Sequence, residues 1–440
     1  MQAEPTPSST SSFSQRNANS LKGVIIFLLT FVLLIPTNMI EVIIQERQSR
    51  QYEAVNEVAG KWGLTQTLTG PVIVIPYEKI IRNETGQEKE RETKYAYVLP
   101  DELHITGEVF PEKRYRGIFE VVVYNSKLAL DGTFPKPALD DIIPTGSVIL
   151  WDKAVVQLGI PDLRGLKEQV RLTWDDQAAV VFEPGLSVSG VATSGIHINK
   201  PLSAGGDAHR FRIDLALQGS GSLFFTPVGK VTEVNIKSAW SDPSFAGAFL
   251  PDQKNISSAG FDAQWKVLNL NRNYPQAWND DRQVDFSNSV FGVDFLLPVD
   301  NYQKSIRSVK YAILFIGLTF LVIFFVEMRN TRRVHPFQYA LIGLALVIFY
   351  TLLVSISEHI SFNAAYGVAA AMTVILTGLY ARALFDSRKM AMLVGGTLTL
   401  LYGFLFTVLQ SQDYALLIGS LGLFAILATV MYFSRKIDWQ

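Results

Sequence analysis

The chain of 440 residues contains no cysteine. Disulfide bonds, a thiolate nucleophile and metal sites with cysteine ligands are therefore excluded. Histidine is also scarce, with five in the whole chain. We find no Gly-x-Ser-x-Gly elbow, Walker loop, His-Glu-x-x-His pair or dinucleotide-binding glycine motif. The sequence thus predicts a protein that is not an enzyme, with no catalytic residue, no cofactor and no metal site.

An excess of charge of one sign is also lacking. The chain has 39 Lys plus Arg and 40 Asp plus Glu, a net charge of −1. Residues 45–306 are mildly acidic, with 27 basic and 33 acidic residues, and no basic patch of the kind that binds DNA or RNA stands out. We therefore expect no nucleic-acid partner.

What the sequence has instead is long apolar runs. A membrane-spanning helix needs about 20 mostly apolar residues, and lipid-exposed backbone must satisfy its own hydrogen bonds. One candidate run lies near the N-terminus and five lie within residues 307–440. The predicted spans are Gly23 to Ile44, Val309 to Val326, Phe337 to Ile356, Ala364 to Leu384, Met390 to Leu409 and Tyr414 to Phe433.

Basic residues near the spans indicate the orientation, because they accumulate on the cytoplasmic side. If the N-terminus is inside, the inner segments contain ten Lys and Arg, whereas the two short outer loops contain none. We therefore expect both termini in the cytoplasm and residues 45–306 outside, in the periplasm if the organism is Gram-negative. The expected location is the bacterial inner membrane, crossed several times.

The first span could also be a cleaved signal peptide, because Gly23 to Ile35 has the length of a signal-peptide core. We favour an uncleaved anchor, since no small-x-small cleavage site is present and apolar residues resume at Met39. Pro36 should kink this helix. Residues 1–22 are rich in Ser, Thr, Asn and Gln, which predicts a disordered cytoplasmic tail.

After the first span the helical period continues and then changes to two. Val55, Val58, Ala59 and Trp62 predict one face of an amphipathic helix that ends at Gly63. Seven later segments are rich in β-branched and aromatic residues, as strands are: Val72 to Tyr77, Tyr95 to Leu99, Leu103 to Val109, Gly117 to Leu130, His209 to Leu217, Val231 to Trp240 and Phe261 to Leu270. We expect one or two antiparallel sandwiches.

The fold class is accordingly a mixed integral membrane protein with six transmembrane α-helices and a large all-β, sandwich-like periplasmic domain between the first two. The expected divisions are a tail (1–22), helix 1 (23–44), the periplasmic domain with its leading helix (45–306) and a five-helix bundle (307–440).

Ionisable groups at mid-bilayer are costly and usually functional, but the middles of all six spans are free of charge. Glu327, Glu358, His359 and Asp413 sit at span ends, where we expect water to solvate them. Glu358 and His359 are the candidates for a proton or ligand site in the bundle, although an interfacial cap explains them as simply.

Several stretches resemble the inner-membrane CreD family: EVAGKWGLTQTLTGPVIVIPY after the first span, GFDAQWKVLNLNRNYPQAW at 260–278, and HPFQYALIGLALVIFYTLLVSISEHISF at 335–362. The resemblance runs from the first span to SRKIDW at 434–439. It implies a role in cell-envelope integrity in Gram-negative bacteria, altered tolerance to certain colicins, and control by a two-component sensor and regulator. No catalytic residues follow from it.

Within the outer domain, Trp265, Asn273 and Tyr274 are the candidates for a functional surface, although Trp265 shares a strand face with Phe261 and Ala263, as core residues do. The expected partners are membrane lipids and envelope proteins of the periplasm or outer membrane. We predict a non-enzymatic envelope protein that acts through its β domain. The alternatives are a transporter or channel for a lipid or small solute that uses the bundle, and an envelope-acting hydrolase.

Overall fold

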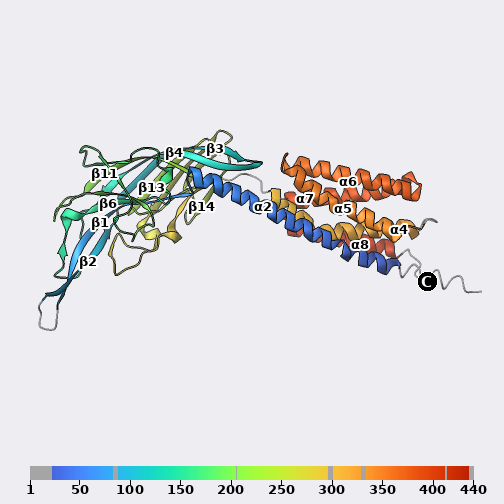
Figure 1. Cartoon of the computed structure of the whole chain (residues 1–440), viewed down its shortest axis with the longest axis horizontal. Helices are drawn as coiled ribbons and strands as arrows, with labels where there is room; N and C mark the ends of the chain where they lie inside the picture. The colour runs from blue at the N-terminus through green and yellow to red at the C-terminus, as the bar shows by residue number, and fades with distance from the viewer. Residues whose placement is uncertain are drawn as a thin grey trace, which may run out of the picture. The chain divides into compact units, whose positions relative to one another are not determined.

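A computed structural model of the chain describes residues 22–82, 88–204, 206–295, 301–328, 333–411 and 414–435. These residues form two compact units, one drawn from Met1–Gln51 and Val299–Gln440, the other from Tyr52–Pro298. The first is helical and the second consists mainly of β-strands (Figure 1). Of the predicted tail, only Lys22 lies within the described residues.

In the helical unit, five of the described helices are long and apolar enough to cross a membrane. They are Lys22–Trp62, which contains α2 (Leu34–Trp62), and α5 (Pro336–Ser357), α6 (Phe362–Phe385), α7 (Arg388–Gln410) and α8 (Ala415–Ser434). A sixth span results if α3 (Asn301–Lys310) and α4 (Ala312–Met328) are counted together, since a bend of 44° separates them. The span predicted from Val309 to Val326 thus starts in α3 and ends in α4.

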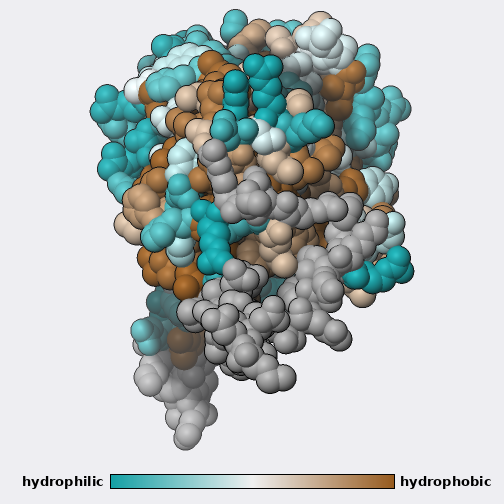
Figure 2. Space-filling view, turned by 90° about the vertical axis from the view of Figure 1, so that its right-hand side faces the viewer, coloured by the Kyte–Doolittle hydropathy of each residue, from teal (hydrophilic) through white to brown (hydrophobic). Residues whose placement is uncertain are grey.

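Apolar side chains lie both inside and outside this unit. Phe315, Phe320, Tyr339, Phe349 and Tyr350 are fully buried between the helices. Other large apolar side chains of α6 and α8 are exposed, among them Ile375, Leu379, Leu416 and Phe424, and Figure 2 shows hydrophobic side chains at the surface between hydrophilic ones. Apolar surface of this extent fits contact with lipid rather than water.

The first long helix has a turn at Leu33, three residues before Pro36. Pro36 has no N–H to donate to the carbonyl of Val32, which accounts for the irregularity. Gly63 ends the helix as predicted, with its N–H donating to the carbonyl of Ala59 at 2.9 Å. Its φ of +152° suits glycine, and a Cβ atom there would lie 2.9 Å from the carbonyl oxygen of Gln218.

The β unit contains two sheets. The first has ten of the described strands in the order β14-β18-β12-β1-β6-β10-β9, with β2, β5 and β17 off this path. These strands are β1 (Gln66–Arg82), β2 (Glu88–Val98), β5 (Val148–Ile149), β6 (Val155–Gly159), β9 (Glu183–Pro184), β10 (Gly195–Asn199), β12 (Ser222–Phe225), β14 (Pro243–Gly247), β17 (Ala277–Asn279) and β18 (Phe291–Phe295).

The second sheet has eight of the described strands in the order β15-β16-β13-β3-β4-β11-β7-β8. They are β3 (Glu102–Arg116), β4 (Phe119–Phe134), β7 (Arg171–Trp174), β8 (Val180–Val181), β11 (His209–Ser220), β13 (Val231–Ser238), β15 (Gln253–Ser257) and β16 (Gly260–Leu268). Short 3₁₀ turns stand between strands at Trp151–Lys153, Leu163–Gly165, Asn269–Asn271 and Ser287–Ser289.

The two sheets share one hydrophobic core, to which both contribute buried residues. Aromatic rings connect them: Phe245 of β14 packs 5.6 Å from Trp265 of β16, and Tyr124 of β4 packs 5.3 Å from Phe295 of β18. Of the two arrangements left open by the sequence, the structure has one sandwich with a single core.

All seven predicted strands lie within or overlap observed ones, and the alternation in β11 is confirmed, because Phe211, Ile213, Leu215 and Leu217 are buried. The expectation of purely antiparallel sheets is wrong in two places. β1 pairs with β12, and β3 with β13, in parallel. Each of these pairs joins strands more than a hundred residues apart in the sequence, so no hairpin connects them and local patterning could not reveal the pairing.

Candidate functional site

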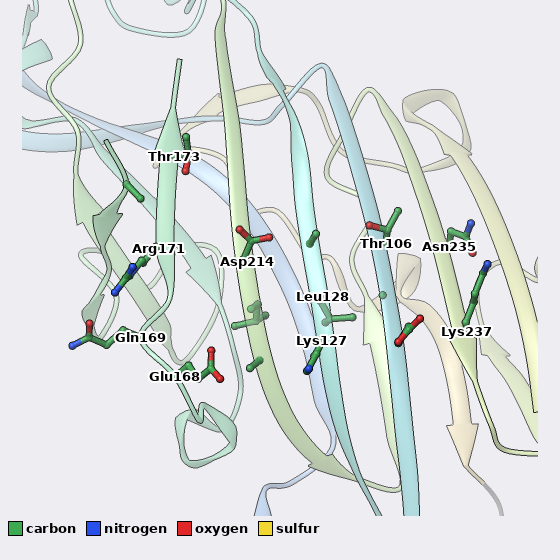
Figure 3. Close-up of a pocket in the computed structure, with 16 residues that line it drawn as sticks. Thr106, Lys127, Leu128, Glu168, Gln169, Arg171, Thr173, Asp214, Asn235 and Lys237 are labelled. Atoms are coloured by element: carbon green, nitrogen blue, oxygen red, sulfur yellow. The ribbon is translucent and has the colours of Figure 1, made fainter. Parts of the chain in front are cut away.

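A broad groove lies on the outer face of the eight-stranded sheet. Successive side chains of a strand point to opposite faces, and on this sheet Ile105, Leu130 and Ile213 point into the core. The residues between them point outward and line a hollow of about 1250 Å³ across five neighbouring strands (Figure 3). Its lining includes Thr106, Glu108, Lys127, Ala129, Glu168, Gln169, Arg171, Thr173, Asp214, Asn235 and Lys237.

Strand register arranges these side chains in rows that cross the strands. The middle row runs from β11 to β13 and consists of Asp214, Ala129, Thr106 and Asn235. The row on one side alternates in charge: Lys127, Glu108, Lys237 and then Asp262 of β16. The row on the other side runs Arg212, Asp131, His104, Glu233 and Lys266. The groove therefore has a floor of mostly short, uncharged side chains between two rims of alternating charge.

The rim charges largely compensate one another. Lys266 lies 2.8 Å from Glu233, and this hydrogen bond is the main reason that the pKa of Glu233 lies below its usual range. Arg212 and Asp214 are 3.0 Å apart, and Lys237 and Asp262 are 3.4 Å apart. A surface with both signs of charge suits a polar partner with both signs better than a polyanion.

The groove continues into a second hollow of about 630 Å³ over β13, β16 and β15. Thr106 and Asn235 line both hollows. The side-chain Oδ1 of Asn235 is buried and accepts no hydrogen bond from the described residues. Asn235 thus lies at the junction of the two hollows.

Two of the groove's carboxylates, Asp214 and Glu108, lie on strands two places apart in the sheet and one row apart. At ordinary sheet spacings their Cα atoms are therefore about 12 Å apart. Two carboxylates that hydrolyse a glycosidic bond are about 5–9.5 Å apart. Among the described residues, no group of three His, Asp or Glu side chains is placed to hold a metal ion.

The surface residues predicted in the β unit fall into two classes. Trp265 and Tyr274 are buried in the core. The Tyr274 hydroxyl donates to the carbonyl of Pro227 at 3.1 Å and lies 3.0 Å from Ser289 Oγ. Asn273 is exposed beside them. The structure thus packs Trp265 and Tyr274 into the core, although Trp265 also lines the second hollow, and Asn273 lines neither hollow.

Arg272, next to Asn273, holds this stretch against neighbouring loops. Its guanidinium donates to the carbonyl oxygens of Tyr274 at 2.7 Å, Val228 at 3.2 Å and Gly229 at 3.3 Å, and lies 4.1 Å from the ring centre of Tyr274. Burial lowers the pKa of Arg272. The residue ties the loop after β16 to the loop before β13, which is a structural function.

In the helical unit, two carboxylates are held by residues far away in the sequence. Glu327 binds Lys22, accepts a hydrogen bond from the Tyr339 hydroxyl at 2.9 Å and another from the backbone N–H of Val334 at 2.9 Å. Only 9% of its side chain is exposed. The expectation that water solvates Glu327 is wrong, because its partners replace water.

Glu358 is held in the same way. Arg47 donates to both carboxylate oxygens, at 2.6 and 2.7 Å, and the Tyr302 hydroxyl donates at 2.8 Å. The side chain of Glu358 is again only 9% exposed, against 30% for Arg47. The expectation of a solvated Glu358 is therefore also wrong. His359 is exposed, and Asp413 lies outside the described residues.

Both clusters join a cation of the first long helix, a carboxylate and a tyrosine hydroxyl. Lys22 and Glu327 are 305 positions apart, and Arg47 and Glu358 are 311 apart. We call them the Lys22 clip and the Arg47 clip. The sequence did not predict either clip. The one signal in the sequence that could indicate them is that each carboxylate and each cation stands at the end of an apolar run.

Comparison with known proteins identifies the family of the chain. Residues 18–440 match the family model "Inner membrane protein CreD". The chain is 33% identical over 417 residues to the inner membrane protein CreD of Escherichia coli (strain K12), and the match covers 93% of this chain and 91% of that protein. The chain belongs to the CreD family, and it is a multi-pass inner-membrane protein.

Proposed function

We propose that this member of the CreD family is a non-enzymatic protein that maintains cell-envelope integrity. In this proposal the β unit lies in the periplasm and binds an envelope partner, while the helices anchor it in the inner membrane. Control by a two-component system, which the family resemblance implies, would adjust how much of the protein is present.

The observation that carries the proposal is the groove on the eight-stranded sheet. It spans several strands, and its rims carry both signs of charge. Standard protein interfaces occupy about 800 Å² on each partner and need such a broad, polar-rimmed surface.

A bulky charge in the groove tests this proposal. Ala129 lies in the middle row on β4, and its side chain points outward. Ala129→Arg should block the groove and fail to restore the parental response to colicins and the envelope integrity of a deletion strain. The matched control is Ala246→Arg, on β14 of the other sheet, where the side chain is half-buried like that of Ala129. Equal restoration by both variants, at equal protein levels, would count against the proposal.

The orientation is tested separately, because the chain has no cysteine of its own. Ser258→Cys lies at the exposed turn between β15 and β16, and Ser387→Cys lies between α6 and α7. With both termini in the cytoplasm, a membrane-impermeant maleimide should label position 258 in cells with a permeabilised outer membrane and leave 387 unlabelled. The reverse labelling would overturn the orientation.

A further inference from the structure

The bent pair of α3 and α4 in the helical unit has a short apolar part. The apolar run extends from Tyr311 to Val326, and this length of helix covers about 24 Å. The hydrocarbon core of a bilayer is about 30 Å thick. If the pair crosses the membrane as one span, α3 has to cover the remaining thickness, at the level where the acyl chains meet the headgroups.

Contacts within the helical unit place the start of α3 at the end where α5 and α7 finish and α6 begins. Asn301 Nδ2 donates to the carbonyl of Ser357 at 2.9 Å. Lys304 Nζ lies 3.5 Å from Gln410 Oε1 and 5.4 Å from the ring centre of Phe362. All three of these neighbours stand at the ends of apolar helices. The first turn of α3 therefore lies at a membrane surface.

One face of α3 is occupied by packing against other helices. Tyr302, Ser305, Ser308 and Val309 are buried, and the Tyr302 hydroxyl belongs to the Arg47 clip. Since this face is fixed within the helical unit, the opposite face of α3 has to point away from it, toward lipid.

That opposite face is basic. α3 contains Lys304, Arg307 and Lys310 and no acidic residue. At 3.6 residues per turn, these three positions fall within an arc of about 120° around the helix. Arg307 and Lys310 are exposed, and Lys304 is half-buried. We call these three residues the basic face of α3.

The described neighbours of α3 leave this charge uncompensated. Glu358, the carboxylate that contacts α3 through Tyr302, is already paired with Arg47. Neither Arg307 nor Lys310 pairs with a carboxylate among the residues that the structure describes. An unpaired cation that faces lipid is costly. The anion that a membrane offers at this depth is the phosphodiester of a lipid, which an arginine side chain can bind through two N–H groups.

We propose that the basic face of α3 binds the headgroup of an anionic phospholipid, such as phosphatidylglycerol. Several basic residues on one interfacial helix favour a lipid with a net negative charge over a zwitterionic one. The bound lipid compensates the charge of α3 beside the short apolar run. This site is independent of the groove in the β unit and of the side of the membrane on which α3 lies.

Lipid-selective quenching of a fluorophore tests this in the full-length protein, which has no cysteine of its own. Ile313→Cys places the label one turn beyond Lys310, where the side chain is 45% exposed, and Val368→Cys on α6, where it is 44% exposed, is the matched control. Both labelled proteins are placed in phosphatidylcholine nanodiscs. A small fraction of either phosphatidylglycerol or phosphatidylcholine then carries a nitroxide on its acyl chain near the glycerol.

At position 313 we expect phosphatidylglycerol to reach half-maximal quenching at a mole fraction at least about fivefold lower than phosphatidylcholine, since one basic residue near an anionic headgroup favours it by roughly that factor. At position 368 the two lipids should quench equally. Arg307→Gln combined with Lys310→Gln should remove the preference at 313, whereas Arg307→Lys combined with Lys310→Arg should keep it. Circular dichroism checks that both variants fold.

Equal quenching by the two lipids at position 313 of the otherwise unchanged protein would overturn the proposal, whatever the variants do. A preference for phosphatidylglycerol that is as large at position 368 would also overturn it, because the preference would then belong to the whole helical unit. So would a preference at 313 that persists in the folded double glutamine variant.

Discussion

The Arg47 clip gives the sharpest prediction about the helical unit. Replacing Glu358 by Gln keeps the shape of the side chain and removes its charge. Arg47 then loses a bidentate partner, and a charge-assisted pair of this kind is stronger than a neutral hydrogen bond. The structure therefore predicts that Glu358→Gln loosens the first long helix from the other helices.

The magnitude follows from the exposure of the two side chains. Breaking a fully buried ion pair costs about 3–5 kcal/mol, whereas an exposed pair is worth about 0–1 kcal/mol. Glu358 is 9% exposed but Arg47 is 30% exposed, so water relieves part of the unpaired charge. We expect a loss of about 1–3 kcal/mol, between these two limits.

The assay is thermal unfolding of the full-length protein in nanodiscs, with two comparisons. Glu46 pairs with Arg50 on the same helix at 2.6 Å, but both side chains are 56% exposed; Glu46→Gln should change stability by less than about 0.5 kcal/mol. The double variant Arg47→Met, Glu358→Gln leaves no unpaired charge, and should recover part of the stability that Glu358→Gln loses.

The same variants separate a structural clip from the transporter alternative. If Glu358 carries a proton or ligand, the double variant should fail to restore envelope integrity in a deletion strain even where its stability recovers. If Glu358 is a clip, the restoration of envelope integrity should follow stability. A Glu358→Gln protein as stable as the Glu46→Gln control would refute the reasoning.

Three further predictions concern other described contacts. Lys22→Met should lower the thermal unfolding midpoint of the protein in nanodiscs, because Glu327 would remain buried without its cation; an unchanged midpoint would contradict the Lys22 clip. The Arg164 side chain is the main cause that lowers the pKa of Asp162, so Asp162 stabilises the fold above its unfolded pKa of about 3.9 and this contribution is lost as the pH falls through its lower folded pKa. Asp162→Asn should therefore lower the thermal unfolding midpoint at pH 7. The difference between the midpoints of the variant and the parent protein should become smaller in acid, and a difference independent of pH would contradict this. Trp265→Ala should cost about 3–5 kcal/mol, as for a large core residue, measured by urea unfolding; a loss below about 1 kcal/mol would mean that Trp265 belongs to a surface instead.

Features set by local pattern were predictable from the sequence. Apolar length alone located the long helices, and alternation located β11, because a period of two places every second side chain in the core. Gly63 was predictable as a helix end for the same local reason. Where α3 meets α4, length alone predicted one continuous helix, because the apolar run gives no sign of the bend before Ala312.

Features set by partners distant in the sequence were not predictable. A carboxylate at the end of an apolar run looks solvated unless its cation is known, and the cations of Glu327 and Glu358 lie more than 300 positions away. The groove has the same origin. Alternation shows that Thr106 and Ala129 point outward, but only the order β11-β4-β3-β13 places them in one row.

Two aromatic residues that the sequence suggests for a surface of the outer domain pack into its core. Trp265 and Tyr274 stand in a stretch that resembles the CreD family, and such a resemblance arises from packing as readily as from binding. The residues that line the groove are small or ordinary polar types, which carry no signal in the sequence by themselves.

Site-specific photo-crosslinking in living cells tests the central claim, that the groove binds an envelope partner, most directly. A photoreactive amino acid at Thr106, in the middle row, should form a discrete adduct with an envelope protein, and Ala129→Arg in the same chain should abolish it. The same amino acid at Ala246, on the other sheet, should give no such adduct. An adduct that survives Ala129→Arg, or one that forms equally at position 246, would contradict the account.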